Sequence, residues 1–177
     1  RSESGNGGDI RVLSAGSTQE LGRINASSAA NGNGGFVEVS GRRLQLTQRA
    51  DLSAAPGYTA GTLLLDPTVL HIVAGSGTLN PPVFFGDGSG TESVSASALD
   101  TGSTLQLQAT QDVIVDAGVQ VVLNNDTDLQ VTTQTGDFTM QAGSSIRATN
   151  PLASLTVVAG QDANLRDLQV FAFQHLL

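Results

Sequence analysis

Short runs of alternating apolar and polar residues, separated by turns rich in glycine and proline, dominate the stretch 34–67. Three such runs follow one another at 36–39, 44–46 and 63–65. Successive side chains of a β-strand point to opposite faces, so this alternation predicts strands with one buried face. No helical periodicity of comparable length is present. The pattern therefore predicts an all-β protein.

A repeat of roughly 25 residues runs along the chain. Similar phrases begin at Leu105, Leu129 and Leu155. Earlier in the chain, the phrases GGDIRVLSAG, GGFVEVSGRR and GTLLLDPTVL return at a similar spacing, beginning at Gly7, Gly34 and Gly61. Such a unit is too short for a closed domain but suits one coil of a solenoid. We therefore expect a right-handed parallel β-helix, with the handedness taken from the general preference of parallel crossover connections.

Equivalent residues of successive coils stack into ladders in such a fold, and each coil adds about 4.8 Å. We expect roughly seven coils, which would make a rod on the order of 30 Å long. Two interior ladders are expected, Leu105 with Leu129 and Leu155, and Val113 with Phe138 and Ala163.

The acids Asp112, Asp137 and Asp162 recur at the same point of three successive repeats. A ladder of carboxylates could bind cations that compensate its repulsion. Each of these acids follows Gln or Gly, however, and an aspartate that caps a turn explains the same placement. We expect the turn-capping role.

One stretch, 74–104, interrupts the repeat, because two prolines and several glycines favour loops over ladder strands. The chain is accordingly expected to form a single β-helix with first coils at 1–73, an irregular loop excursion at 74–104 and further coils at 105–177.

The excursion carries the candidates for a binding site, which are Phe84, Phe85 and Asp87. Two adjacent phenylalanines on a loop offer a contact surface, or they pin the loop to the rod. Pinning is the more common role of such residues.

The net charge of −8 is unevenly distributed, since six of the eight arginines lie at or before Arg49 and residues 50–146 contain ten acids and no Lys or Arg. Phosphate contacts need clustered basic residues, so nucleic acid is not expected as a partner. There is no cysteine, which excludes disulfides and thiolate metal sites. No apolar run is long enough to span a membrane.

Catalysis is not expected, although parallel β-helices also carry enzymes that cleave polysaccharides. Such chemistry needs converging carboxylates or a basic residue beside them. His71 and His175 both lie in apolar runs, which is typical of structural histidines. Asp126 and Asp128, which are separated by a single residue, are weak candidates for a calcium site, but calcium needs six to eight oxygen ligands and an ordinary polar turn fits equally well. We expect no cofactor.

The phrases GGFVEVSG, ADLSA and GTLLLDP, followed by VSASALDTGSTLQLQATQDVIVDAG, resemble large exoproteins of the filamentous haemagglutinin type, which Gram-negative bacteria secrete by the two-partner route. The resemblance covers roughly 7–143, and GTLLLDP is its most specific part. It implies a right-handed parallel β-helix, export through an outer-membrane transporter barrel, and a role at the cell surface, commonly adhesion. The amino-terminal secretion domain of that family is not evident, so we expect an internal fragment.

Taken together, these observations favour a structural and adhesive segment of a secreted bacterial surface protein. Its expected partners are the transporter barrel during secretion and a surface glycan or protein receptor. A carbohydrate-binding or carbohydrate-cleaving β-helix is the alternative, motivated by the acidic middle of the chain and by the loop that contains Phe84.

Overall fold

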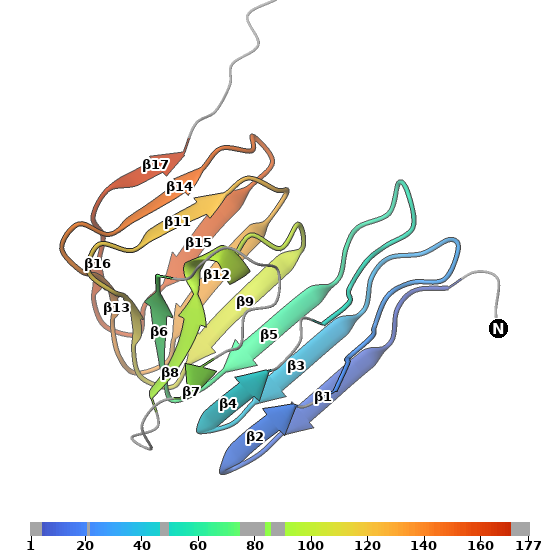
Figure 1. Cartoon of the computed structure of the whole chain (residues 1–177), viewed down its shortest axis with the longest axis horizontal. Helices are drawn as coiled ribbons and strands as arrows, with labels where there is room; N and C mark the ends of the chain where they lie inside the picture. Colours follow the sequence, from blue (N-terminus) through green and yellow to red (C-terminus); the bar gives the residue numbers. More distant parts are fainter. Residues whose placement is uncertain (1–4, 21, 47–49, 75–83, 86–90, 171–177) are drawn as a thin grey trace, which may run out of the picture.

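The computed structural model describes residues 5–20, 22–46, 50–74, 84–85 and 91–170. The chain winds into a β-solenoid of about five turns, with parallel sheets and almost no helix (Figure 1). Sheet I, one of two six-stranded sheets, takes one strand from each turn of the chain. Its strands, in spatial order, are β1 (Asp9–Leu13), β3 (Phe36–Ser40), β5 (Thr62–Asp66), β9 (Thr104–Ala109), β12 (Asp128–Thr133) and β15 (Ser154–Val158).

Three further sheets complete the coils, and every strand pair except β7 with β8 is parallel. Sheet II contains, in spatial order, β16 (Ala163–Asn164), β13 (Phe138–Met140), β10 (Val113–Val115), β6 (Val69–Val73), β8 (Thr91–Ser95) and β7 (Phe84–Phe85). Sheet III contains β11 (Gln120–Leu123), β14 (Ser145–Ala148) and β17 (Leu168–Val170), and sheet IV contains β2 (Ser17–Glu20) and β4 (Arg43–Leu46).

The carboxyl-terminal coils have three sides, because the chain passes through sheets I, II and III in turn. Their register confirms the stacking expected for both ladders, although Ala163, at the end of the second ladder, is exposed and not interior. Leu129 lies opposite Leu105 on one side and Leu155 on the other. Phe138 lies opposite Val113 and Ala163 in the same way.

The interior of the solenoid is filled by alternate residues of each strand. Along β12, for example, Leu129, Val131 and Thr133 are buried, whereas the side chains between them reach the surface. Burying one Leu or Val side chain contributes about 1.5–3 kcal/mol, so the stacked ladders supply the main driving force for winding. The last coil is less well covered, since Leu155 is only half-buried.

The amino-terminal coils close differently, through a narrow neck made of backbone. The N–H of Gly35 donates to the carbonyl of Ala26 at 2.8 Å, and the N–H of Gly61 donates to Leu52 at 2.9 Å within the next coil. A Cβ atom on Gly35 would lie 2.2 Å from the carbonyl oxygen of Gly8. No side chain fits at this position, which explains why a glycine, Gly35, immediately precedes β3.

Beyond the neck, the loops 27–33 and 53–60 project from sheet I and stack on each other, and we call them the arm (Figure 1). The N–H of Ser28 donates to the carbonyl of Ser53 at 2.9 Å, and that of Gly34 donates to Thr59 at 2.9 Å. The two loops of the arm are therefore hydrogen-bonded to each other in the same way as neighbouring strands of sheet I.

The predicted excursion at 74–104 contains regular structure where it is described. After β6, strand β8 pairs with β6 on the side opposite β10, and β7 pairs with β8 and lies beside β4. A 3-10 turn, η1 (Ala96–Ala98), then lies beside β11 and leads back to sheet I. None of the described helices is long and apolar enough to cross a membrane.

The expectation of about seven coils is wrong, because the turn that contains the excursion uses more chain than the others. This turn runs from Thr62 to its register partner Thr104 and includes the whole excursion. The other turns of sheet I are much shorter, as between Thr104 and Asp128 or between Asp9 and Phe36. The chain consequently completes about five turns.

Candidate functional site

The two phenylalanines that are candidates for a binding site are part of sheet II. Phe84 and Phe85 make up β7, whose register places them opposite Ser93 and Glu92 of β8. The backbone of β7 is thus tied to the rod by an antiparallel pair, as the pinning role requires. Asp87, the third binding candidate, lies outside the described residues, as does His175.

The two weak calcium candidates, Asp126 and Asp128, have different surroundings. Asp126 is exposed, whereas Asp128 begins β12 and its carboxylate accepts hydrogen bonds from Gln130 at 2.6 Å and from Ser154. Within the described ranges, no group of three or more His, Asp or Glu side chains could hold a metal ion.

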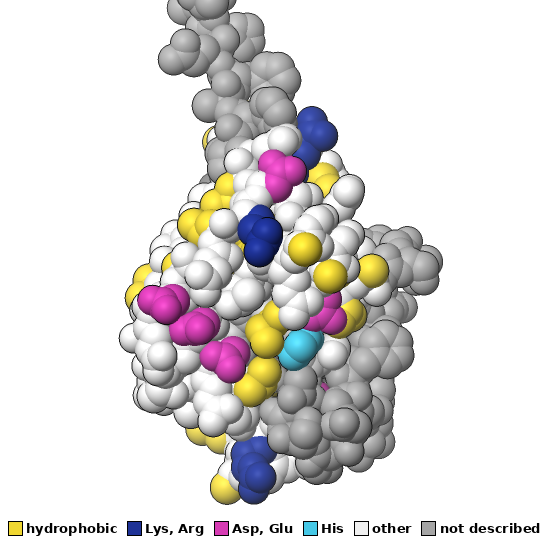
Figure 2. Space-filling model, turned by 90° about the vertical axis from the view of Figure 1, so that its left-hand side faces the viewer, with side chains coloured by type: hydrophobic (Ala, Val, Ile, Leu, Met, Phe, Trp, Pro, Cys, Tyr) yellow, Lys and Arg dark blue, Asp and Glu magenta, His cyan; other side chains and the backbone are white. Residues whose placement is uncertain are grey.

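The recurring aspartates bind the backbone of the next coil. Oδ1 of Asp112 accepts the N–H of Asp137 at 2.8 Å, and Oδ1 of Asp137 accepts the N–H of Asp162 at 3.0 Å. Figure 2 shows a diagonal row of three acidic side chains on this side of the molecule. Gly136 makes room for the row, because a Cβ there would lie 2.2 Å from Oδ1 of Asp112. These bonds support the turn-capping role.

His71 is not isolated, contrary to the impression that its apolar neighbours give. It points outward from β6, and its Nδ1 lies 2.6 Å from Oδ1 of Asp116, which follows β10 in the next coil. The histidine is visible among hydrophobic side chains in Figure 2. In register, Ser93 lies on the other side of His71, but no hydrogen bond joins the two side chains. The pair therefore links two coils and lacks a bonded nucleophile.

Two acids lie on the outer face of sheet I, Glu38 on β3 and Asp66 at the end of β5. Burial, together with the nearby charge of Glu38, raises the pKa of Asp66. Glu38 itself accepts a hydrogen bond at 2.6 Å from Arg11, whose guanidinium lies 4.8 Å from the ring centre of Phe36. A carboxyl with a raised pKa beside a second carboxyl is the pairing that glycosidases use. Neither acid, however, lines the groove described next.

An open groove lies where the arm ends, and we call it the step groove. Its walls are the last layer of the arm with its neck, 50–60, and the turn 101–103 that begins the next coil, with Leu63 between them. The groove arises because the next coil has no arm, so that the outer surface of this layer stays uncovered along its length (Figure 1). Its volume of about 570 Å³ lies within the range typical of small-molecule sites, roughly 300–1,000 Å³.

One charged side chain of the step groove is held in place from two sides. Asp51 accepts hydrogen bonds from the backbone N–H of Ser53 at 3.2 Å and from its hydroxyl at 2.8 Å, and Arg23 approaches at 3.2 Å. The two bonds from Ser53, and more weakly Arg23, lower the pKa of Asp51. Asp51 is therefore an oriented anion at neutral pH.

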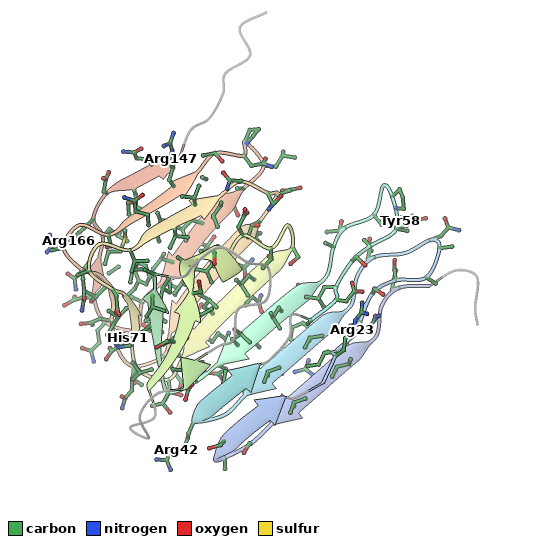
Figure 3. The ribbon with its side chains drawn as sticks, in the orientation of Figure 1. Arg23, Arg42, Tyr58, His71, Arg147 and Arg166 are labelled. Carbon is green, nitrogen blue, oxygen red and sulfur yellow. The ribbon has the colours of Figure 1, made fainter. Side chains whose placement is uncertain are left out.

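Sequence reasoning missed the step groove and its aromatic residue, Tyr58. The ring is half-exposed, and Figure 3 places it at the outer end of the arm, with Arg23 nearer the sheet. A signal was present, since the only tyrosine of the chain follows Pro56 and Gly57 in a turn. The opposite wall could not be foreseen, because Thr101 lies far along the chain, near the end of the excursion.

Comparison with known proteins returns no match, whether with family models, with curated proteins or with solved structures.

Proposed function

We propose that this chain is a structural and adhesive segment of a secreted surface protein of a Gram-negative bacterium, and that it performs no catalysis. The observation that carries the proposal is sheet I, whose six parallel strands stay in register from Asp9 to Val158. A continuous sheet of this kind makes a spacer that holds its shape without a globular core.

The absence of cysteine supports an exported rod. Each interior strand pairs with the coil before and the coil after it, so stability comes from nearest neighbours and needs no disulfide. A chain without disulfides can cross an outer-membrane barrel unfolded and wind up outside. The phrases GGFVEVSG and GTLLLDP, which resemble haemagglutinin-type exoproteins, agree with this route.

The arm supports the adhesive part of the proposal. Its two loops project from an otherwise regular rod and are held by backbone hydrogen bonds such as that between Ser28 and Ser53. A projecting element with a groove along its last layer can contact a receptor, while the sheets behind it fix its position.

Secretion is tested by placing the chain behind a two-partner secretion domain in a Gram-negative host, with and without the matching transporter barrel. We expect the chain to reach the cell surface or the medium only when the barrel is present. Retention in the periplasm with a working barrel, while the secretion domain alone is exported, would contradict the proposed route.

Adhesion is tested with beads coated with the folded chain and applied to epithelial cells and to bacterial cells. Beads coated with the Leu129→Asp variant, whose interior is disrupted, serve as the control. We expect the folded chain to raise bead attachment above this control. If beads with the parent chain attach no better than the control beads to any of these cells, the result would count against an adhesive role.

A further inference from the structure

The step groove brings together three kinds of side chain on two separate segments. The arm contributes Tyr58 and the carboxylate of Asp51, and the turn opposite contributes the hydroxyls of Thr101 and Ser103. Leu63 forms an apolar contact surface between them. An exposed aromatic ring, an acceptor of fixed orientation and a few hydroxyls around an open groove are complementary to a molecule that has both apolar faces and hydroxyl groups.

The ring of Tyr58 is presented by a tight turn. Its backbone N–H donates to the carbonyl of Ala55 at 3.0 Å, and the preceding residue, Gly57, has a φ of +84°, which only glycine adopts readily. The side chain is 49% exposed. A large aromatic surface is therefore kept accessible on a loop whose backbone conformation is fixed, so binding would cost little ordering of the loop.

Asp51 and the turn opposite supply directional hydrogen bonding. An ionised carboxylate offers about four acceptor positions, and Asp51 uses three of them, two for Ser53 and one for Arg23. On the other wall, the hydroxyl of Thr101 donates to the carbonyl of Ser103 at 3.1 Å and accepts from the hydroxyl and the N–H of Ser103 at 2.9 and 3.3 Å, so its hydrogen-bonding capacity is used. The hydroxyl of Ser103 is oriented by this bond and keeps its lone pairs. The groove thus retains acceptor capacity on both walls, at Asp51 and at Ser103.

We propose that the step groove binds a short, uncharged glycan, with one sugar ring against Tyr58 and sugar hydroxyls donating to Asp51 and to the hydroxyl of Ser103. The carbon-bound hydrogens of a pyranose face pack on an aromatic ring, whereas its hydroxyls need acceptors of this kind. The charge of Asp51 and the net charge of −8 disfavour acidic sugars. This inference rests on the adhesive function proposed above and names its receptor class.

The composition of the chain provides a direct measurement, because Tyr58 is its only tyrosine and there is no tryptophan. Intrinsic tyrosine fluorescence therefore reports on the groove alone. The full chain is titrated with glucose, galactose, mannose, N-acetylglucosamine, lactose and cellobiose, and with galacturonate as a charged comparison. We expect at least one neutral sugar to change the emission saturably and galacturonate to bind more weakly. No change with any neutral sugar, or tightest binding of galacturonate, would overturn the proposal.

Variants then locate the site by calorimetry, which does not depend on the tyrosine signal. Tyr58→Ala should weaken the binding of the responding sugar about tenfold, which corresponds to about 1.4 kcal/mol, and Tyr58→Phe should stay close to the parent chain because it keeps the ring. Leu152→Ala, which truncates a side chain exposed elsewhere on the rod, is the matched control. Unchanged affinity in a folded Tyr58→Ala variant would refute the assignment.

Bead attachment separates this inference from the adhesive function. Target cells are treated with periodate, which oxidises vicinal sugar hydroxyls, or with protease. If glycans are the receptor, periodate should abolish attachment of beads coated with the parent chain. Attachment that survives periodate but is lost after protease would refute the glycan while leaving adhesion intact. No attachment to untreated cells would instead count against adhesion itself, whatever the sugar titrations show.

Discussion

The carboxylate of Asp112 accepts the backbone N–H of Asp137, its counterpart one coil later, at 2.8 Å. Asp112→Ala should lower the free energy of unfolding by about 1 kcal/mol, the net value of one hydrogen bond. Asp112→Asn keeps an acceptor oxygen and should lose less. Urea denaturation measures both, with Asp126→Ala as a control for removing an exposed acid. An equal loss in Asp112→Ala and Asp126→Ala would mean that the bond contributes nothing.

The same bond predicts the response to calcium. Because Asp112 and Asp137 each hold a backbone N–H, we expect them to offer no set of free ligands. The midpoint of thermal unfolding should be the same in calcium chloride and in a chelator. A midpoint raised by calcium would restore the interpretation of the aspartate row as a cation site.

Leu129 lies in the middle of an interior ladder, between Leu105 and Leu155. Leu129→Asp would bury a charge without a partner and should lower the free energy of unfolding by about 3–5 kcal/mol. Thr132→Asp, on the outer side of the same strand, is the matched control and should cost far less. Similar losses in the two variants would refute the assignment of inner and outer faces.

Gly35 and Gly8 provide a matched pair at the neck of the arm. A Cβ on Gly35 would meet the carbonyl oxygen of Gly8 at 2.2 Å, whereas a Cβ on Gly8 would meet nothing within 4 Å. Gly35→Ala should therefore lower the free energy of unfolding by about 2 kcal/mol or more, and Gly8→Ala should leave it nearly unchanged. Chemical denaturation of both variants checks this difference, and an equal effect would contradict the close approach of the two backbones.

Asp66 should destabilise the fold when it is charged. Its pKa is raised above the ordinary value of 3.8 by burial and by Glu38, so the folded state binds the proton more tightly than the unfolded state. The cost therefore appears as the pH rises from 3.8 through the folded pKa, and it persists at neutral pH. Asp66→Asn should gain about 0.2–1 kcal/mol at neutral pH and nothing once the pH is below the ordinary pKa.

Denaturation at the two pH values tests this dependence, with Asp126→Asn as the control for removing an exposed charge. A gain of the same size in acid and at neutral pH would show that the effect of Asp66→Asn comes from packing and not from ionisation.

The part of the fold that the sequence predicted is the part that repeats. Leu105, Leu129 and Leu155 could be aligned because each of their coils has the same three-sided plan, and the recurring aspartate marks the same corner each time. Where the plan changes, the period fails. Strand β8 contains one large apolar residue, Val94, and its partner β6 lies less than one full repeat earlier, so alternation and period both left it unrecognised.

The step groove illustrates a different limit. Tyr58 and Thr101 come together only because the arm stops at one coil and a turn begins the next. Local pattern contains no information on that change of cross-section. The sequence therefore identified the rod, but it did not indicate that the layer at 50–60 and the turn 101–103 form a groove together.

Only sheet I, among the sheets of the described residues, runs from the first coil to the last. Sheets II and IV do not form one continuous sheet, because β7 and β8 of sheet II lie between β4 of sheet IV and β6. Sheet III begins only with β11. The hydrogen bonds of sheet I lie along the rod, so tension applied between the two ends falls on them directly. The short register between β5 and β9, from Thr62 to Leu65, is then the link that carries the load past the excursion. In a tether under tension, the rod would be expected to yield there first, with Leu63 and Leu65 separating from Leu105 and Leu107.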